Sequence, residues 1–309
     1  MPSTRLEAEH GLEPGWIEAR TGIRERRWAD AETATSDLAV AAARSALADA
    51  GADASQPDLL IVATSTPDWP QPATAAAVHG GLGMRHNAGC FDLNAVCSGF
   101  VHALHSGLAM LAANEAWSSV LVVGADVYSR ILDPADRATS VLFGDGAGAV
   151  LLQRPPAGLG AACPGFRFES GTQFAGHEAL IVPGGGSRSP LTAASLKAGE
   201  DRFQMIGREV RDYGVPAFVA GVRAVAGEGS PGFVVPHQSN LRMLEAAMAD
   251  LGLAGEDWHT TLPWTGNTAA ASIPIALDDA RRSGLVPAAG SLVFVGYGGG
   301  LSWAALALD

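Results

Sequence analysis

Cysteine is scarce in this chain, which has three in 309 residues: Cys90, Cys97 and Cys163. Their spacing fits no metal-ligand pattern, so neither a metal site nor a metal cofactor is expected. Three thiols cannot all pair with one another, which agrees with a reducing environment. We therefore expect a cytoplasmic protein.

Positive charge and long apolar runs are also scarce. Only 20 Lys and Arg residues stand against 32 Asp and Glu, a formal net charge of −12, so nucleic acid is not expected as a partner. No apolar run reaches membrane-spanning length, and MPSTRLEAEHG at the start has no apolar core of a signal peptide. Neither a membrane span nor export is expected.

Hydrophobic residues and glycine are abundant. The chain is 48% hydrophobic, contains 38 glycines and has only 17% charged residues, which argues against disorder. This length and composition suffice for a full buried core in one large or two fused domains. The sequence therefore predicts a globular protein of the size of an enzyme.

The most informative stretch is FDLNAVCSGF, residues 91–100. A β-compatible run ends there at three small residues, and the alanine-rich segment 100–113 is typical of a buried helix. Cys97 would lie at the N-terminus of that helix, where free amides and the helix dipole favour a reactive thiolate. The alternative is an inert buried cysteine, and this stretch alone leaves both open.

Predicted strands alternate with predicted helices, which indicates an α/β protein with helix-covered sheets. The second half repeats the order of elements of the first, so we expect an internal duplication of about 150 residues, with halves 1–157 and 158–309. The expected helices are 36–50, 73–82, 100–113 and 241–251. The expected strands include 58–66, 88–95, 119–127 and 232–236. Residues 141–153 are expected to form a hairpin or strand pair, and residues 155–200 a surface excursion.

Two polar residues of the second half follow from this duplication. His237 comes directly after a strand, and Asn267 lies near the place that Cys97 has in the first half, at the start of an alanine-rich helix. Because equivalent strand ends meet when related halves pack together, we expect the three side chains in one place. The alternatives are a satisfied core histidine and a plain helix cap.

A cluster of arginines follows Trp16, in the run WIEARTGIRERR, with Arg137 further along the chain. Arginine binds phosphate groups bidentately and an aromatic ring can stack on a base, so a phosphate-bearing ligand would explain the cluster. A solvated group of charges at a helix end is the alternative.

Seven segments together resemble a known family. They are WIEARTGIRERR, VCSGF, DPADR, LFGDGAGA, VVPHQSNLRML, WTGNTAAASIPIAL and YGGGLSW, and they occur in the order found in β-ketoacyl-acyl carrier protein synthase III, a condensing enzyme of the thiolase superfamily. The resemblance covers nearly the whole chain from Trp16 on. It implies a thiolase-like fold in which two duplicated halves form a layered αβαβα sandwich with mixed five-stranded sheets.

The resemblance also implies a reaction. Cys97 would take an acyl group from an acyl-CoA primer, with the backbone amides of Cys97 and Gly299 holding the oxyanion. His237 and Asn267 would bind the carbonyl of a malonyl thioester while it loses carbon dioxide. The substrate is a thioester of coenzyme A or of acyl carrier protein, and no separate cofactor is expected.

Further contacts rest on the same resemblance. The strand 88–95 and the prolines at 67–72 resemble the family's dimer contact, so a homodimer is expected. The ligand contacts implied are Trp16 and Arg137 for the adenine of coenzyme A, Arg20 for a phosphate, Asn240 for the pantetheine tunnel, and Arg242, Arg208 and Arg211 for an acidic carrier protein.

Two departures from the family leave points open. The family begins with an apolar strand and a glycine turn that this sequence does not show, so either the start codon is misplaced or the first sheet lacks a strand. Gln71 stands where the family often has an apolar residue that reaches into the partner's primer pocket, so the primer is open. A plain acyltransferase and a non-catalytic subunit are the alternative functions, and Asn267 favours condensation.

Overall fold

The computed structural model describes residues 1–154, 165–227 and 231–309. The first half forms a four-stranded sheet in the order β2-β1-β3-β4. Its first three strands are parallel and β4 runs antiparallel to β3. The strands are β1 (Leu59–Ala63), β2 (Gly89–Leu93), β3 (Ser119–Asp126) and β4 (Gly146–Gln153).

The second half forms another four-stranded sheet, in the order β5-β10-β9-β8. Here β10 runs antiparallel to both of its neighbours, and β8 is parallel to β9. The strands are β5 (Phe166–Thr172), β8 (Phe233–Pro236), β9 (Leu292–Gly298) and β10 (Ser302–Leu308).

The expectation of five-stranded sheets is therefore wrong for the described residues, and the two halves lack opposite edge strands. By order and direction, β1, β3 and β4 correspond to β8, β9 and β10. The counterpart of β2 is reduced to an isolated bridge between Val234 and Trp258. Beside β4, no described segment takes the place that β5 has beside β10.

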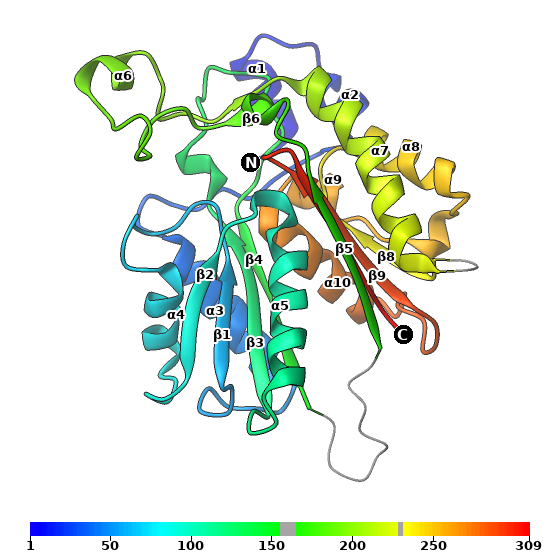
Figure 1. Ribbon diagram of the computed structural model, residues 1–309. Coiled ribbons are helices and arrows are strands. Elements are labelled where there is room, and N and C mark those ends of the chain that lie inside the picture. The colour runs from blue at the N-terminus through cyan, green and yellow to red at the C-terminus, as the bar shows by residue number, and fades with distance from the viewer. Residues whose placement is uncertain (155–164, 228–230) are drawn as a thin grey trace.

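Helices cover both sheets and also lie between them, which confirms the layered αβαβα arrangement (Figure 1). The helices α3 (Thr35–Asp49) and α4 (Thr74–Leu82) pack on the first sheet, and α7 (Gly207–Ala226) packs on the second with α8 (Leu241–Leu251) beside it. In the central layer, α5 (Gly99–Ala113) and α10 (Ser272–Arg282) each contact both sheets. The core between the sheets includes Phe100, Leu104, Val122, Phe294 and Leu306.

The central helix α5 also explains the one described stretch that is long and apolar enough to cross a membrane. This stretch, Val96–Ala113, has a mean hydropathy of 1.4 over 18 residues. The expectation that no stretch reaches this length is wrong here. Because α5 contacts both sheets, its apolar side chains are those of a core helix.

The predicted excursion at 155–200 contains a strand of the second sheet, β5, which is a correction. Its alternating Phe166 and Phe168 lie against His105 of α5, with Phe168 stacked on that ring at 3.8 Å. After β5 the chain forms β6 (Leu180–Ile181) and α6 (Ala193–Lys197), which projects from the body as the predicted excursion would (Figure 1), and then β7 (Gln204–Met205). The predicted boundary at 157/158 and Cys163 lie outside the described residues.

Two further elements lie at the end of the sheets where the parallel strands finish. They are α2 (Trp16–Thr21), which contacts α8, and α9 (Leu262–Thr265), which precedes α10. The first helix, α1 (Ser3–Glu9), packs on α2.

Candidate active site

Cys97 lies in a tight turn between β2 and α5. The turn is a short 3-10 helix, η1 (Val96–Ser98), and α5 begins at Gly99. Val96 has a φ of 49°, a left-handed value that a β-branched residue rarely adopts. The prediction that Cys97 lies at the N-terminus of a buried helix is confirmed, and the thiol residue itself is buried.

The second half contains the same turn before α10. It is η5 (Ala269–Ala271), and Ala269 has a φ of 47°. In both turns an asparagine three residues before the central residue accepts a backbone amide: Asn94 from Val96 at 3.2 Å, and Asn267 from Ala269 at 2.9 Å. The counterpart of Asn267 is therefore Asn94, and Ala270 occupies the place of Cys97. This corrects the predicted alignment of the halves by three residues.

Two strands pass very close to these turns, and glycine allows the approach. A Cβ on Gly124 of β3 would lie 2.4 Å from the carbonyl oxygen of Ala270, and one on Gly296 of β9 would lie 3.0 Å from that of Cys97. A Cβ on Gly298 would lie 2.8 Å from Cβ and 3.1 Å from Sγ of Cys97. Each half therefore packs one strand end against the turn of the other.

One cavity brings the three predicted residues together. It has a volume of about 150 Å³, and Cys97, His237 and Asn267 all line it. Asn267 uses its carbonyl oxygen on the Ala269 amide, which leaves its NH₂ group as a donor for a ligand. The rest of the wall is mostly apolar, with Val96, Tyr128, Leu142, Phe143, Leu180, Phe203, Met205, Val210, Met243 and Tyr297.

An aromatic cluster forms one side of this cavity. Tyr128 stacks on Phe143 with 4.6 Å between ring centroids, and Phe203 lies edge-on to both at 5.5 and 5.2 Å. Tyr128 is buried, and its hydroxyl accepts a hydrogen bond from Ser65 at 3.3 Å. These rings close one side of the cavity that Cys97 also lines.

The protonation states differ from the expected thiolate. Burial, and after it the charge of Asp126, raise the pKa of the Cys97 thiol well above its ordinary value. Burial also lowers the pKa of His237 to about 3, so the imidazole is neutral at pH 7. The free protein therefore holds a neutral thiol beside a neutral base, because desolvation outweighs the helix terminus.

Ser272, the first residue of α10, controls the tautomer of His237. Its Oγ lies 2.7 Å from His237 Nδ1 and 2.8 Å from the carbonyl oxygen of Ala269. When the hydroxyl donates to Ala269, Nδ1 carries the proton and Nε2 is free to accept one. When it donates to Nδ1, Nε2 carries the proton and becomes a donor.

The structure brings most of the predicted coenzyme A residues together near this cavity. The Arg20 guanidinium lies over the Trp16 ring at 4.6 Å, and the pairing of Trp16 with Arg137 around an adenine stays a prediction. Asn240 lines the cavity, caps α8 and donates to the Arg20 carbonyl at 3.3 Å. Arg137 is exposed in the loop after β3.

The other residues with a predicted ligand or partner contact lie on the surface or next to Cys97. Arg208 and Arg211 both pair with Asp212 near the start of α7, and Arg242 pairs with Glu245. Gln71 is exposed on the loop before α4, as a residue that reaches another subunit would be. Gly299 directly follows Gly298, which packs on Cys97. These roles stay predictions.

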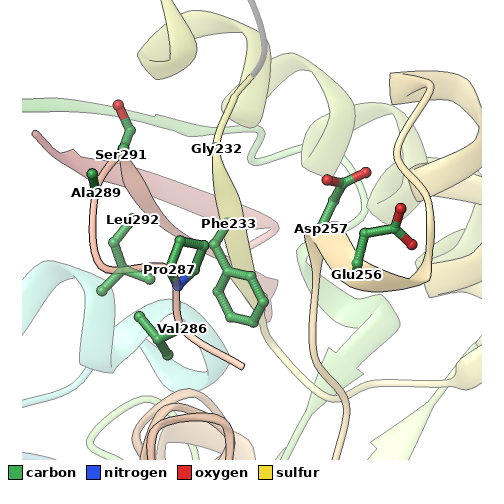
Figure 2. A pocket seen from close by; sticks show the side chains of 10 residues that line it. Gly232, Phe233, Glu256, Asp257, Val286, Pro287, Ala289, Ser291 and Leu292 are labelled. Carbon is green, nitrogen blue, oxygen red and sulfur yellow. The ribbon is translucent and has the colours of Figure 1, made fainter. Parts of the chain in front are cut away.

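Another cavity, of about 160 Å³, lies at the opposite end of the second sheet (Figure 2). It is lined by Phe233 and Leu292, which begin β8 and β9, whereas the Cys97 cavity lies beyond their other ends. Figure 2 shows Val286 and Pro287 beside Phe233, with the carboxylates of Glu256 and Asp257 across from them. No cluster of three or more metal-ligating side chains occurs within residues 1–154, 165–227 and 231–309.

Sequence reasoning missed several residues of the site. Asp126 carried a signal, because a single acidic residue ends the otherwise apolar strand β3. Ser272 and Gly298 lie inside recognised segments, but only the packing shows what they contact. For Tyr128 and Phe203 the sequence holds no signal, since an aromatic residue in a loop is equally compatible with the surface.

Comparison with known proteins agrees with this geometry. Two sequence models match the chain: 3-oxoacyl-(acyl-carrier-protein) synthase III over residues 91–168, and its C-terminal part over residues 229–309. An acetoacetyl-CoA synthase of Streptomyces sp. is 46% identical over 301 residues, 96% of this chain and 90% of that protein. A β-ketoacyl-acyl-carrier-protein synthase III of Rhodospirillum rubrum is 42% identical over 293 residues, 93% of this chain and 88% of that protein.

Solved structures show the same relationship. The 3-oxoacyl-(acyl carrier protein) synthase III of Pseudomonas aeruginosa PAO1 has a TM-score of 0.87 at 37% identity, covering 100% of this chain and 93% of that one. The priming β-ketosynthase of the R1128 polyketide pathway has a TM-score of 0.86 at 32% identity, covering 100% and 91%. The chain therefore belongs to the β-ketoacyl-acyl carrier protein synthase III family of condensing enzymes, which have the thiolase-like fold.

Proposed function

We propose that this protein condenses a short acyl-CoA primer with a malonyl thioester, releasing carbon dioxide and forming a β-ketoacyl thioester. The observation that carries the proposal is the joint placement of Cys97, His237 and Asn267 in one small, largely apolar cavity. A thiol with a neutral base supports acyl transfer, and two hydrogen-bond donors support an enolate.

In the first half-reaction, the Cys97 sulfur attacks the carbonyl carbon of the primer thioester. With Ser272 donating to Ala269, His237 Nε2 accepts the thiol proton, and the same proton then goes to the departing coenzyme A sulfur. The amides of Cys97 and Gly299 are proposed to hold the oxyanion. The pKa values fit this order, because a thiol that ionises only during attack needs a base beside it.

In the second half-reaction, the malonyl thioester carbonyl takes the place vacated by coenzyme A. The Asn267 NH₂ group and protonated Nε2 of His237 donate to its oxygen, so loss of carbon dioxide leaves an enolate held by two hydrogen bonds. The enolate carbon attacks the acyl group on Cys97, the sulfur leaves as a thiolate, and a proton taken up from solvent restores the thiol. A plain acyltransferase has less need of this second pair of donors.

We propose acyl carrier protein as the carrier of the malonyl group. A second candidate, malonyl-CoA, is favoured by the ion pairs of the predicted docking arginines. Arg208 and Arg211 share Asp212, and Arg242 pairs with Glu245, so two carboxylates offset two of these three positive charges on a protein of net charge −12. The name of the Streptomyces relative, an acetoacetyl-CoA synthase, points in the same direction.

The test uses the wild-type protein with acetyl-CoA and a malonyl thioester labelled in the free carboxyl group. We expect labelled carbon dioxide and an acetoacetyl thioester, with malonyl-CoA and malonyl carrier protein compared at equal concentration. Cys97→Ala is the control and should form neither acyl-enzyme nor product. An acyl-enzyme that passes its acyl group to an alcohol or amine, with no carbon dioxide formed, would establish the acyltransferase instead.

A further inference from the structure

The turn η5 holds both groups that the second half-reaction requires. Asn267 is fixed by the Ala269 amide, and His237 is fixed by Ser272, whose hydroxyl also bonds the carbonyl of Ala269. Ser272 directly follows the turn in the sequence. A displacement of η5 therefore moves the Asn267 amide and the His237 imidazole together.

Asp126, at the end of β3 in the other half, contacts this turn from outside. Its Oδ2 accepts a hydrogen bond from the Ala270 amide at 2.9 Å. Its Oδ1 accepts from the amides of Ser65 and Thr66, at 2.8 and 3.1 Å, and from the hydroxyls of Thr64, Ser65 and Thr66. The side chain is fully buried. One carboxyl group thus ties the loop after β1 to η5.

The equivalent position in the other half is a glycine. Gly124 packs on Ala270, and Gly296 packs on Cys97; two residues further along, β3 has Asp126 and β9 has Gly298. The Asp126 carboxylate accepts a hydrogen bond from the Ala270 amide, the central amide of η5. In the other half, a Cβ on Gly298 would lie 3.2 Å from the amide nitrogen of Cys97. The two turns are alike, but η5 is held by a carboxylate, whereas η1 is packed against a glycine that has no side chain to bond it.

The partners of Asp126 require its ionised form. Both carboxylate oxygens accept from backbone N–H groups. A proton on Oδ2 would point at the N–H of Ala270, so two donors would face each other and the hydrogen bond would be lost. Burial raises the pKa of Asp126, while the amides of Ser65 and Ala270 lower it. Its charge in turn raises the pKa of the Cys97 thiol. Asp126 therefore does not activate the Cys97 thiol, and its hydrogen bond to η5 points to a different role.

We propose that Asp126 is a positioning residue for decarboxylation: through the Ala270 amide it holds η5 in the place where Asn267 and His237 bind the malonyl carbonyl. This inference rests on the proposed function. Cys97 belongs to the other turn, so its acylation depends on this contact only through His237, whereas decarboxylation depends on it through both His237 and Asn267. Loss of the contact should separate the two half-reactions.

Asp126→Asn is the decisive variant, because it keeps the shape of the side chain. Its carbonyl oxygen can still accept from Ser65 and Thr66, but its NH₂ group then faces the Ala270 amide, donor against donor. Asp145→Asn is the matched control. Asp145 is also a buried carboxylate, and it accepts from Ala29 and Ser129 without contacting η5.

Three measurements are made on the full-length wild type and both variants. They are the rate of Cys97 acetylation by mass spectrometry, the release of carbon dioxide from malonyl-CoA by acetylated enzyme, and hydrogen exchange of a peptide spanning residues 267–272. For Asp126→Asn we expect carbon dioxide release lower by about ten- to a hundredfold, acetylation lowered by a clearly smaller factor, and faster exchange in the peptide. Asp145→Asn should change neither the ratio of the two rates nor this exchange.

Equal loss of both rates in Asp126→Asn, or slow exchange as in wild type, would overturn the proposal. Should Asp126→Asn not fold, Asp126→Ser removes the same carboxylate with a smaller side chain and should show the same order of losses, larger for carbon dioxide release than for acetylation. If wild-type protein releases no carbon dioxide, the proposed function fails. The exchange measurement then still decides whether Asp126 fixes η5.

Discussion

Replacing Tyr128 by leucine should shift the chain length of the primer. Tyr128 is buried against Phe143 at 4.6 Å and lines the cavity that holds Cys97. Leucine removes the part of the ring that closes this side, which leaves room for further carbons of an acyl chain. A buried CH₂ group contributes about 0.8 kcal/mol, so the two carbons that separate butanoyl from acetyl are worth about 1.6 kcal/mol. This corresponds to a factor of about 15 in the ratio of kcat/KM values.

The assay is kcat/KM for Cys97 acylation with acetyl-, butanoyl- and hexanoyl-CoA. Wild type should prefer acetyl, and Tyr128→Leu should raise the butanoyl-to-acetyl ratio about 15-fold. Tyr213→Leu is the control, because Tyr213 lies on α7 with its hydroxyl bonded to the Leu301 carbonyl and does not line the cavity. An unchanged ratio in an active Tyr128→Leu variant, or the same shift in Tyr213→Leu, would refute the reasoning.

Three further predictions concern the turn, the histidine and the assembly. Gly298→Ala places a Cβ 2.8 Å from that of Cys97 and should slow acylation by at least about tenfold, whereas Gly99→Ala, whose Cβ meets Ala63 at 3.5 Å, should not. His237 stays neutral in the folded protein down to about pH 3, whereas in the unfolded chain its imidazole takes up a proton below its ordinary pKa. The free energy of unfolding should therefore decrease as the pH is lowered from 6.5 to 3. Urea unfolding should show this slope to be about 1.4 kcal/mol per pH unit larger than in His237→Gln, and equal slopes would contradict it. Sedimentation should give a dimer of the 31.6 kDa chain, with a monomer excluding any role of Gln71 in a partner's cavity.

Much of the fold could be predicted from the sequence, because local signals and packing agree. The helix α8 begins and ends at the predicted residues, since Asn240 caps its start and Gly252 ends it in the left-handed conformation. The strands β1 and β3 are fully buried, as their apolar runs indicated. The strand β5 was missed because Gly and Pro residues around it suggested a loop, although its alternating Phe166 and Phe168 carried the signal.

The residues of the site could be predicted from the sequence, but their protonation states could not. Cys97, His237 and Asn267 meet as expected because the duplicated halves bring the ends of equivalent strands together. The alignment of Asn267 with Cys97 was wrong by three residues, since only the backbone turns show that Asn94 and Asn267 correspond. The neutral thiol could not be predicted, because it depends on burial and on Asp126, which is distant in the sequence.

The most direct test of the central claim is a single-turnover experiment on Asn267→Ala. Acetylation of Cys97 needs its own oxyanion site, whereas decarboxylation needs the donors of His237 and Asn267. The variant should therefore become acetylated at Cys97 as wild type does, yet release carbon dioxide from malonyl thioester about a hundredfold more slowly or worse. An Asn267→Ala enzyme that is acetylated and still decarboxylates at the wild-type rate would contradict the account.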